Sequence, residues 1–354
     1  MKKILGIIVG VLLVFVAIGV AMQEAIVERM MPNIVAQNLE RDVVRDLPDG
    51  LHVFVCGAGS PMPNPNAGGP CLVVIAGQDV YVVDAGTGGS RTMALGGVNP
   101  GAVKGLFLTH FHSDHIDGLG EMMLQRWVGG THSAPLPVYG PVGVGAIVDG
   151  FNMAYTPDFG YRVAHHGEDI VPRSGAGGSA VSFAVPPQGQ AVTVLEEGGL
   201  TVIAFSVDHS PVSPAVGYRF DYKGRSVTIS GDTAKSANLE KFAQGTDLLM
   251  HEGLAANLVK IMEQSARQAG RDNLAKIFFD IQDYHATPVE AAQSAETAGA
   301  KMLGFYHIVP PLLVKPMEGL FLRGVEDAYS GPVVVSTDGT FYHMPAGTDD
   351  VSVD

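Results

Sequence analysis

Short apolar runs that end in polar residues are the feature that most restricts the fold of this chain. Past residue 48 they have the length and the Val, Ile, Leu and Phe content of buried β-strands, as in DVYVVDAG, GLFLTHFH, SVTISGDT and KMLGFYH. Helices are predicted between them, near residues 115–128, 142–154, 253–268, 288–299 and 317–328. Strands separated by helices predict an α/β chain whose sheets are covered by helices.

The N-terminal residues follow a different pattern. Lys2 and Lys3 precede an uncharged stretch, Ile4 to Met22, of about the length that crosses a bilayer as a helix. We interpret residues 1–22 as a signal anchor or a cleaved signal peptide, with the lysines inside. The expected location is the cell envelope: anchored in the inner membrane with the main domain outside the cytoplasm, or periplasmic or secreted after cleavage. Residues 23–48 are expected to form a juxtamembrane helix or linker.

The rest of the chain is predicted to form one large domain, residues 49–346, followed by a C-terminal tail, residues 347–354. The segment 168–200 is rich in Gly and Pro and is interpreted as an inserted loop or hairpin, not as a domain boundary. A hydrophobic fraction of 46% supports a sizeable buried core. The formal net charge of -14 disfavours nucleic acid as a partner unless basic residues are locally clustered.

Cys56 and Cys71 are the only cysteines. They end one expected strand and begin the next, so an oxidising compartment would let them pair. Two buried thiols are an equally good interpretation.

The stretch THFHSDHIDGL contains the densest group of metal-ligand types. Strand alternation places His110 and His112 on one side, and Asp114 and His115 follow as the chain turns into a helix. Imidazole and carboxylate are normal zinc ligands. One tetrahedral ion cannot conveniently take so many ligands from one loop, so the pattern predicts two ions.

That stretch resembles the zinc-binding signature of the metallo-β-lactamase superfamily. VDHSPVSPAVGYRF, SGDT, MHEG, YHATPVEAA and GFYHIVPP follow it in order, and the series is most similar to the ribonuclease Z branch and its arylsulfatase-type relatives. Over roughly residues 50–345, the resemblance implies a four-layer αββα sandwich with a dinuclear metal site at one edge of its two sheets.

The resemblance also implies which residues bind two Zn²⁺ ions per chain, with Fe and Mn as alternatives. One ion would be bound by His110, His112 and His209, the other by Asp114, His115 and His307, and Asp232 would bridge them. Asp84, at a strand end, would support the metal loop by hydrogen bonding without binding metal.

The implied reaction is hydrolysis of an ester by a hydroxide that bridges the two ions. Asp114 would orient that hydroxide or accept its proton, and His285 would protonate the leaving group. The alternative for His285 is a helix-capping role before Thr287. His251 and Glu252 would orient this region.

The substrate is predicted from charge and location. Ribonucleases Z that process tRNA grip its phosphates with a protruding arm rich in basic residues and glycine, whereas residues 141–200 of this chain contain only Arg162 and Arg173 as basic residues. We therefore expect a small-molecule ester, an aryl or alkyl sulfate or a phosphodiester, and not nucleic acid. A ribonuclease Z-like tRNA 3′ endonuclease and a lactone or β-lactam hydrolase are the alternatives.

Substrate selection is predicted in FNMAYTPDFGYRVAHHGED. The candidate contacts are Tyr161, Arg162, His165 and His166. Arg162 would pair with a sulfate or phosphate oxygen, or else with Asp158, four residues away on one helical face. The sequence leaves a homodimer open.

Overall fold

The structure is a computed structural model that describes residues 2–354, apart from the side chains at positions 2, 3, 10, 11, 13, 14, 17, 18 and 21. It divides into two compact units, Met1–Val43 and Val44–Asp354. The first contains α1 (Lys2–Ala21) and α2 (Gln23–Glu40). Over the described residues, no helix is both long and apolar enough to cross a membrane. Part of the predicted anchor, residues 1–22, lies outside those residues.

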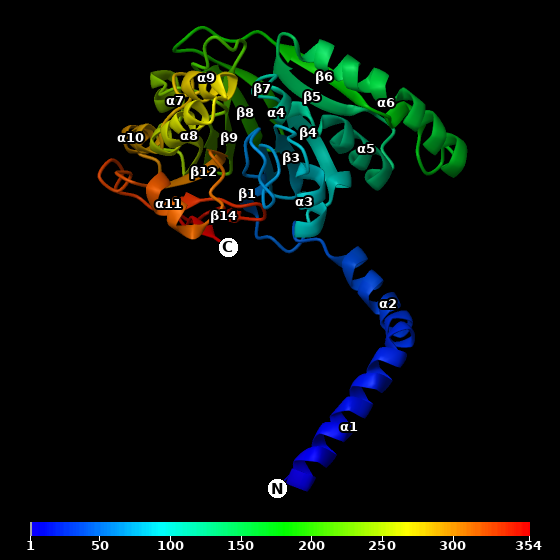
Figure 1. The fold of residues 1–354 in the computed structure, drawn as a ribbon. Coiled ribbons are helices and arrows are strands. Elements are labelled where there is room, and N and C mark those ends of the chain that lie inside the picture. Colours follow the sequence, from blue (N-terminus) through cyan, green and yellow to red (C-terminus); the bar gives the residue numbers. More distant parts are fainter. Residues whose placement is uncertain (1) are drawn as a thin grey trace. The chain divides into compact units, whose positions relative to one another are not determined.

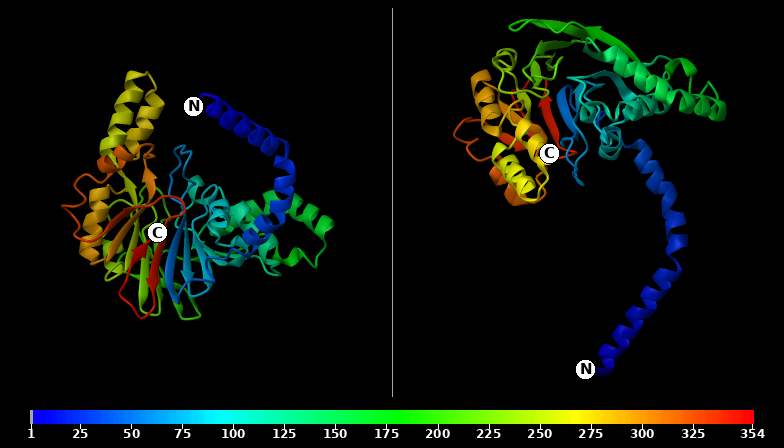
Figure 2. Two further views of the ribbon diagram at one scale, coloured as in Figure 1. Left: turned by 90° about the horizontal axis from the view of Figure 1, so that it is seen from below. Right: turned by 45° about the horizontal axis from the view of Figure 1, so that its top comes forward.

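Two mixed β-sheets form the centre of the second unit (Figure 1). The first sheet has the order β15-β14-β1-β2-β3-β4-β5-β6. Its strands are β1 (Gly50–Gly57), β2 (Cys71–Ala76), β3 (Asp79–Val83), β4 (Val103–Phe107), β5 (Leu136–Pro141), β6 (Gly178–Phe183), β14 (Phe341–Pro345) and β15 (Ser352–Val353). Figure 2 shows the C-terminal strands beside β1, which pairs antiparallel with β14.

The second sheet has the order β13-β12-β11-β10-β9-β8-β7. Its strands are β7 (Ala191–Glu197), β8 (Leu200–Ser206), β9 (Val216–Tyr222), β10 (Arg225–Ile229), β11 (Leu248–Leu254), β12 (Met302–Val309) and β13 (Val333–Val335). The pairs β10–β11, β11–β12 and β12–β13 are parallel. Parallel neighbours end at the same edge of the sheet, which brings the residues that follow them together.

Helices cover the outer faces of both sheets (Figure 1). On one side lie α3 (Gly89–Gly96), α4 (Ser113–Ile116), α5 (Leu119–Gly130) and α6 (Val144–His166). On the other lie α7 (Ala237–Phe242), α8 (Ala256–Gln268), α9 (Asp272–Asp280), α10 (Pro288–Ala298) and α11 (Lys315–Phe321). The α/β class and the layering of helices on sheets agree with the sequence prediction.

The main hydrophobic core lies between the sheets. Alternate residues of β1, such as Leu51 and Val53, point into it and meet Phe220 and Met250 of the second sheet. Phe54, which follows Val53 on β1, is buried but lies outside this cluster because successive side chains of a strand point to opposite faces. A separate cluster packs α10 onto the second sheet through its buried alanines. Thr287 and Glu290 form a capping box that starts α10, as TPVEAA predicts.

Two expectations about the chain's organisation are wrong. Residues 168–200 are not an inserted loop, because they contain β6 and β7, the edge strands of the two sheets. Residues 347–354 are not only a tail, because β15 pairs with β14. Most side chains of β6 are exposed and none of β7 is fully buried, so these strands need few apolar residues and their signal in the sequence is weak.

Cys56 and Cys71 form a disulfide between the end of β1 and the start of β2, and both are fully buried. The sequence left this pairing open. The bond closes a loop of 15 residues.

We expect the double substitution Cys56→Ala, Cys71→Ala to lower the free energy of unfolding by about 3 kcal/mol, since the open loop gains conformational entropy in the unfolded state. Urea denaturation of oxidised wild-type protein against the variant measures this. Dithiothreitol should destabilise the wild type and leave the variant unchanged; equal effects on both would contradict the prediction.

Candidate metal centre

The polar ends of four strands meet at one place. His110, His112, Asp114 and His115 follow β4, which ends at Phe107. His209 follows β8, Asp232 follows β10, and His307 lies near the end of β12. The structure therefore brings together all seven residues that the sequence singled out for metal binding.

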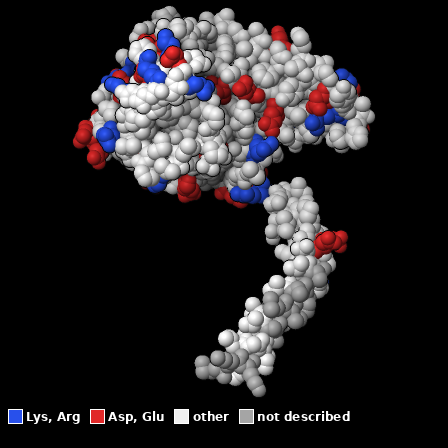
Figure 3. Space-filling model, in the orientation of Figure 1, with Lys and Arg blue, Asp and Glu red and all other residues white. Residues whose placement is uncertain are grey.

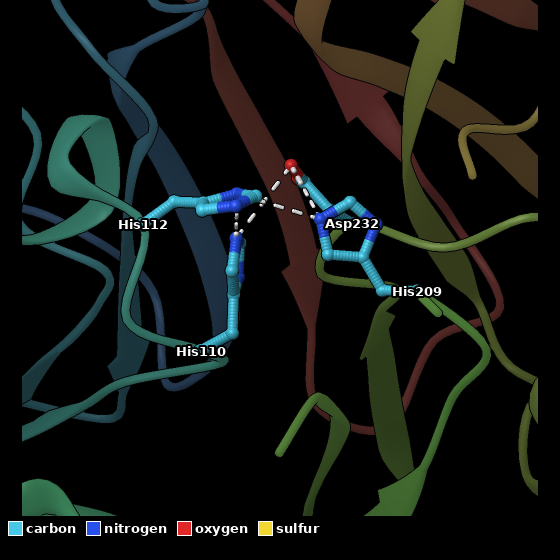
Figure 4. A group of neighbouring side chains, drawn as sticks. All are labelled: His110, His112, His209 and Asp232. Atoms are coloured by element: carbon cyan, nitrogen blue, oxygen red, sulfur yellow. Dashed lines mark hydrogen bonds and ion pairs between the residues drawn. The ribbon is translucent and has the colours of Figure 1, made fainter. Parts of the chain in front are cut away.

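The first group consists of His110, His112, His209 and Asp232 (Figure 4). The His110 Nε2 atom lies 3.0 Å from His112 Nδ1, and His209 Nε2 lies 3.5 Å from that same atom. Asp232 Oδ2 lies 3.8 Å from His110 Nε2 and 3.9 Å from His209 Nε2. Three ring nitrogens and a carboxylate oxygen thus face a common point, which is the donor set of a tetrahedral cation site.

The second group consists of Asp114, His115 and His307. Asp114 Oδ2 lies 3.2 Å from His307 Nε2 and 3.7 Å from His115 Nε2. Asp232 faces this group as well, with 3.4 Å from Oδ1 to His115 Nε2 and 3.4 Å from Oδ2 to His307 Nε2. Its carboxylate is therefore placed to bridge the two groups.

Burial and charge make this donor set fit metal ions. His115 Nε2 and Asp232 Oδ1 are buried and have no well-formed hydrogen bond among the described residues. Burial, together with the nearby His115, holds the pKa of His110 well below its usual value, so its ring is neutral as a ligand requires. Against the effect of burial, Asp232 and Asp84 raise the pKa of His115 well above its usual value. The two carboxylates thus favour positive charge at this point, which is the charge that a divalent ion would bring.

Asp84 forms hydrogen bonds to the segment that carries His110 to His115. Its Oδ1 accepts a hydrogen bond from the Thr109 N–H, and its Oδ2 accepts one from the Thr109 hydroxyl, each at 2.8 Å. Oδ2 also accepts from His115 Nδ1 at 2.8 Å. Because Nδ1 is used in this way, Nε2 of His115 is directed at the site, which is how outer partners orient metal-binding histidines.

Backbone groups fix two other members of the site. His209 Nδ1 donates to the Tyr284 carbonyl at 2.9 Å, which leaves Nε2 for the site. Gly231, just before Asp232, has φ +62, and a Cβ there would lie 2.8 Å from the Val216 carbonyl oxygen. Glycine therefore permits the turn that delivers Asp232.

His285 and Glu252 form a buried pair beside the metal residues. His285 Nδ1 donates to Glu252 Oε1 at 3.0 Å, and the same oxygen accepts from the Ala286 N–H at 3.0 Å. Burial acts to lower the pKa of His285, but the Glu252 carboxylate raises it to about 9. Divalent ions beside Asp232 would lower this pKa again by repulsion. Thr287, not His285, caps α10.

The position of His285 would also allow it to bind a metal ion. Its ring lies within reach of Asp232 and His307, so these three could also hold an ion. His251 is more remote, since it is fully buried in β11 and its Nδ1 bonds to the backbone carbonyl of Glu252 at 2.7 Å. It supports the strand end that carries Glu252.

A cavity of about 760 Å³ opens onto the metal residues. His112, Asp114, Asp232, His285 and His307 form its polar end. The α8–α9 hairpin, the loop around Met62 and the Pro310–Pro311 segment contribute to its other walls. The sequence analysis did not find these walls.

The expected substrate contacts lie elsewhere. Tyr161, Arg162, His165 and His166 are all on α6, and none lines this cavity. Arg162 Nε instead donates to Asp158 Oδ2 at 2.7 Å, the alternative that helical spacing offered. The prediction that these residues select the substrate at the metal centre is not supported by their positions.

Comparisons with known proteins agree with the site. Residues 81–308 match the model of the Beta-lactamase superfamily domain. Ribonuclease Z of Mycolicibacterium paratuberculosis is 36% identical over 265 residues, which cover 74% of this chain and 88% of that protein. The crystal structure of the short form of human tRNase Z is similar in fold, with a TM-score of 0.58 and 20% identity over 83% of this chain and 99% of the other. The metallo-β-lactamase fold protein YhfI from Bacillus subtilis gives a TM-score of 0.56 and 20% identity, with 83% and 99% covered.

Fold and site together define a metal-dependent hydrolase with a His/Asp centre typical of two metal ions. The family model matches more than half of the chain, and the relatives are more than 30% identical to it. The chain therefore belongs to the metallo-β-lactamase superfamily. The family resemblance seen in the sequence is confirmed.

Proposed function

We propose that this chain hydrolyses phosphodiester bonds with a ribonuclease Z-like centre that holds two Zn²⁺ ions. The observation that carries the proposal is the meeting of all seven His and Asp residues at one point, beside the His285–Glu252 pair. The relatives named ribonuclease Z support phosphodiester over sulfate or lactone hydrolysis. Mixed imidazole and carboxylate donors suit zinc, with Fe and Mn as alternatives.

Two bound ions would lower the pKa of water and stabilise negative charge on the reacting phosphate. Asp114 belongs to the second group and lines the cavity, where it can orient an attacking water or accept its proton. His285 lines the same cavity and its Nδ1 is occupied by Glu252, so Nε2 is the atom that can protonate a leaving oxygen. Glu252 positions that ring and favours its protonated form.

The relatives named ribonuclease Z support RNA as the first candidate substrate, which is the opposite of the order expected from composition. A local feature agrees with them: Lys and Arg gather, with some Asp and Glu, over the part of the surface where α7 to α9 lie (Figure 3). The basic residues of the α8–α9 hairpin are Lys260, Arg267, Arg271 and Lys276. Arg267 and Lys276 pair with Glu263 and Asp280 on the same hairpin, so RNA phosphates would compete with these carboxylates, whereas Lys260 and Arg271 offer further basic contacts.

A small phosphodiester is the second candidate, and the cavity favours it. Among the described residues that line the cavity there is no Lys or Arg. A polyanion would find no counter-charge there apart from the metal ions and His285. The chain's formal charge of -14 acts in the same direction.

We also propose that the catalytic domain works outside the cytoplasm. The uncharged stretch from Ile4 to Met22 and the buried Cys56–Cys71 disulfide support an oxidising, exported location. In intact cells of a host with two membranes, an alkaline phosphatase fusion after Asp354 should be active, whereas a fusion to residues 44–354 alone should be inactive. Equal activity of the two would contradict export by the N-terminal segment.

The proposed activity is tested with a substrate panel on full-length, metal-loaded protein. The panel contains bis(p-nitrophenyl) phosphate, p-nitrophenyl sulfate, a lactone, a β-lactam and a precursor tRNA with a 3′ trailer. We expect cleavage of the phosphodiester, loss of that cleavage on metal chelation, and recovery on adding Zn²⁺. Turnover of only the sulfate, the lactone or the β-lactam would refute phosphodiester hydrolysis, and trailer removal separates RNA from the small ester.

A further inference from the structure

The cavity beside the metal centre has apolar walls. Beyond its polar end it is lined chiefly by hydrophobic side chains, including Met62, Leu274, Ile277, Phe278, Val309 and Leu313. At about 760 Å³ it is large enough for a group of drug-like size. The surface is continuous with His285 and Asp114, so a bound group would lie next to the reacting phosphate.

The walls are held in place by packing, so the cavity exists before any ligand binds. Phe278, only 7% exposed, and Val309, 3% exposed, belong to a hydrophobic cluster that joins α8, α9 and the end of β12. Met62 packs against the same cluster from the loop that follows β1. A preformed apolar wall binds an apolar group without having to reorganise.

The mouth of the cavity leaves apolar surface in water. Ile277 on α9 is 52% exposed and Leu313 is 58% exposed, although both line the cavity. Exposed apolar side chains that border a pocket commonly mark a binding site. Covering them with a substrate group would remove this surface from water and favour binding.

The charges decide what kind of group fits. On the described lining, every acidic or imidazole side chain belongs to the metal centre or is His285, and no Lys or Arg is present. The ions and His285 would neutralise one phosphate, and a group beyond them meets hydrocarbon, proline, the Tyr284 ring and the hydroxyls of Ser60 and Ser113. A second phosphate in the cavity would be desolvated without a partner, at a large cost.

We infer that this cavity is a binding subsite for an uncharged, apolar substituent of the scissile phosphodiester, an alkyl chain or an aromatic ring. The inference rests on the proposed phosphodiester hydrolysis and names its substrate class. In that reaction water adds to phosphorus, the bond from phosphorus to the leaving oxygen breaks, and the apolar group stays on the phosphate that is released.

The test uses p-nitrophenyl alkyl phosphates whose alkyl group is methyl, butyl or octyl, each below its critical micelle concentration. All three release p-nitrophenol, so only the group that occupies the subsite changes. We expect kcat/KM to rise with chain length, by about two- to fourfold for each methylene that is buried. Equal kcat/KM across the series would overturn the inference.

Two neighbouring positions on α9 give a matched pair of variants. Ile277→Asp places a carboxylate on the cavity wall at a half-exposed position, where folding tolerates it, and should reduce the octyl-to-methyl ratio of kcat/KM at least tenfold. Phe279→Asp introduces the same charge at a residue that is 57% exposed and does not line the cavity, and should preserve the ratio. An unchanged ratio in Ile277→Asp, or equal reductions in both variants, would also overturn the inference.

The two proposals fail in different ways. If metal-loaded wild-type protein hydrolyses none of the phosphate diesters, including the bis-aryl ester, the proposed function itself is wrong. If it hydrolyses all three alkyl esters equally, hydrolysis stands and the apolar subsite does not. A third outcome is that the protein removes a tRNA trailer, that Ile277→Asp does not change this rate, and that the alkyl esters show no chain-length effect. This would show that the substrate binds at another surface.

Discussion

Asp232→Asn should lower kcat/KM for a phosphodiester by more than about 100-fold, because removal of residues that merely support a metal ligand already costs about 10- to 100-fold. Asp232 is 2% exposed and faces both groups of metal residues, with contacts from 3.4 to 3.9 Å to four histidine nitrogens. An amide has no negative charge to share between two cations. Elemental analysis should find fewer than two ions per chain.

The control for this substitution is Asp117→Asn, at the C-terminal end of α4. Asp117 is exposed and belongs to none of the metal groups found among the described residues. It should retain two ions and near wild-type kcat/KM. Full metal content and activity in Asp232→Asn would contradict the bridging position, and equal losses in both variants would indicate a general effect of lost negative charge.

The metal residues from His110 to His115 were predictable from their own pattern, because they form a cluster of ligand types that few other structures would require. His209, Asp232 and His307 were assigned through the family resemblance, and each lies at or near the end of an apolar strand. Strand ends at one sheet edge converge, so the pattern contains the geometry of the site. Asp84, which directly follows β3, was also assigned through the family resemblance.

Contacts made by backbone groups and by surface helices were not predictable in this way. The Tyr284 carbonyl that orients His209 has no side-chain signature, because every residue has a carbonyl group. The apolar residues of α9 resemble ordinary core positions of a helix, and only the fold shows that some of them face a cavity. A high local density of charged and aromatic residues on α6 suggested substrate contacts, yet Arg162 satisfies its charge with Asp158 on its own helix.

The sequence and the structure differ most informatively on substrate. Net charge is a sum over the whole surface, so it says little about the cavity in which an ester reacts. In the structure, the α8–α9 hairpin has basic residues on its outer surface. The cavity wall beyond the metal centre has no charged side chain. RNA phosphates would contact the first and an apolar ester would enter the second, which is why both substrates belong in the panel.

His285→Ala should lower kcat by about 10²- to 10⁴-fold for a diester with a poorly acidic leaving group, such as an alkyl alcohol, since it removes the group that protonates the leaving oxygen. The loss should be much smaller for a p-nitrophenyl ester, whose leaving group departs without a proton. Metal content should stay at two ions per chain. The comparison needs single-turnover rates with both leaving groups, together with elemental analysis of the variant.

Glu252→Gln and His165→Ala complete this test. The amide that Glu252→Gln introduces can still accept the hydrogen bond from His285 Nδ1 but cannot stabilise a charged ring, so the loss should lie between wild type and His285→Ala and show the same leaving-group dependence. His165 is exposed on α6, away from the cavity, and its removal should change neither rate. Equal losses for both leaving groups, accompanied by a missing ion, would instead make His285 a metal ligand with Asp232 and His307, because those three side chains also lie close enough to share one.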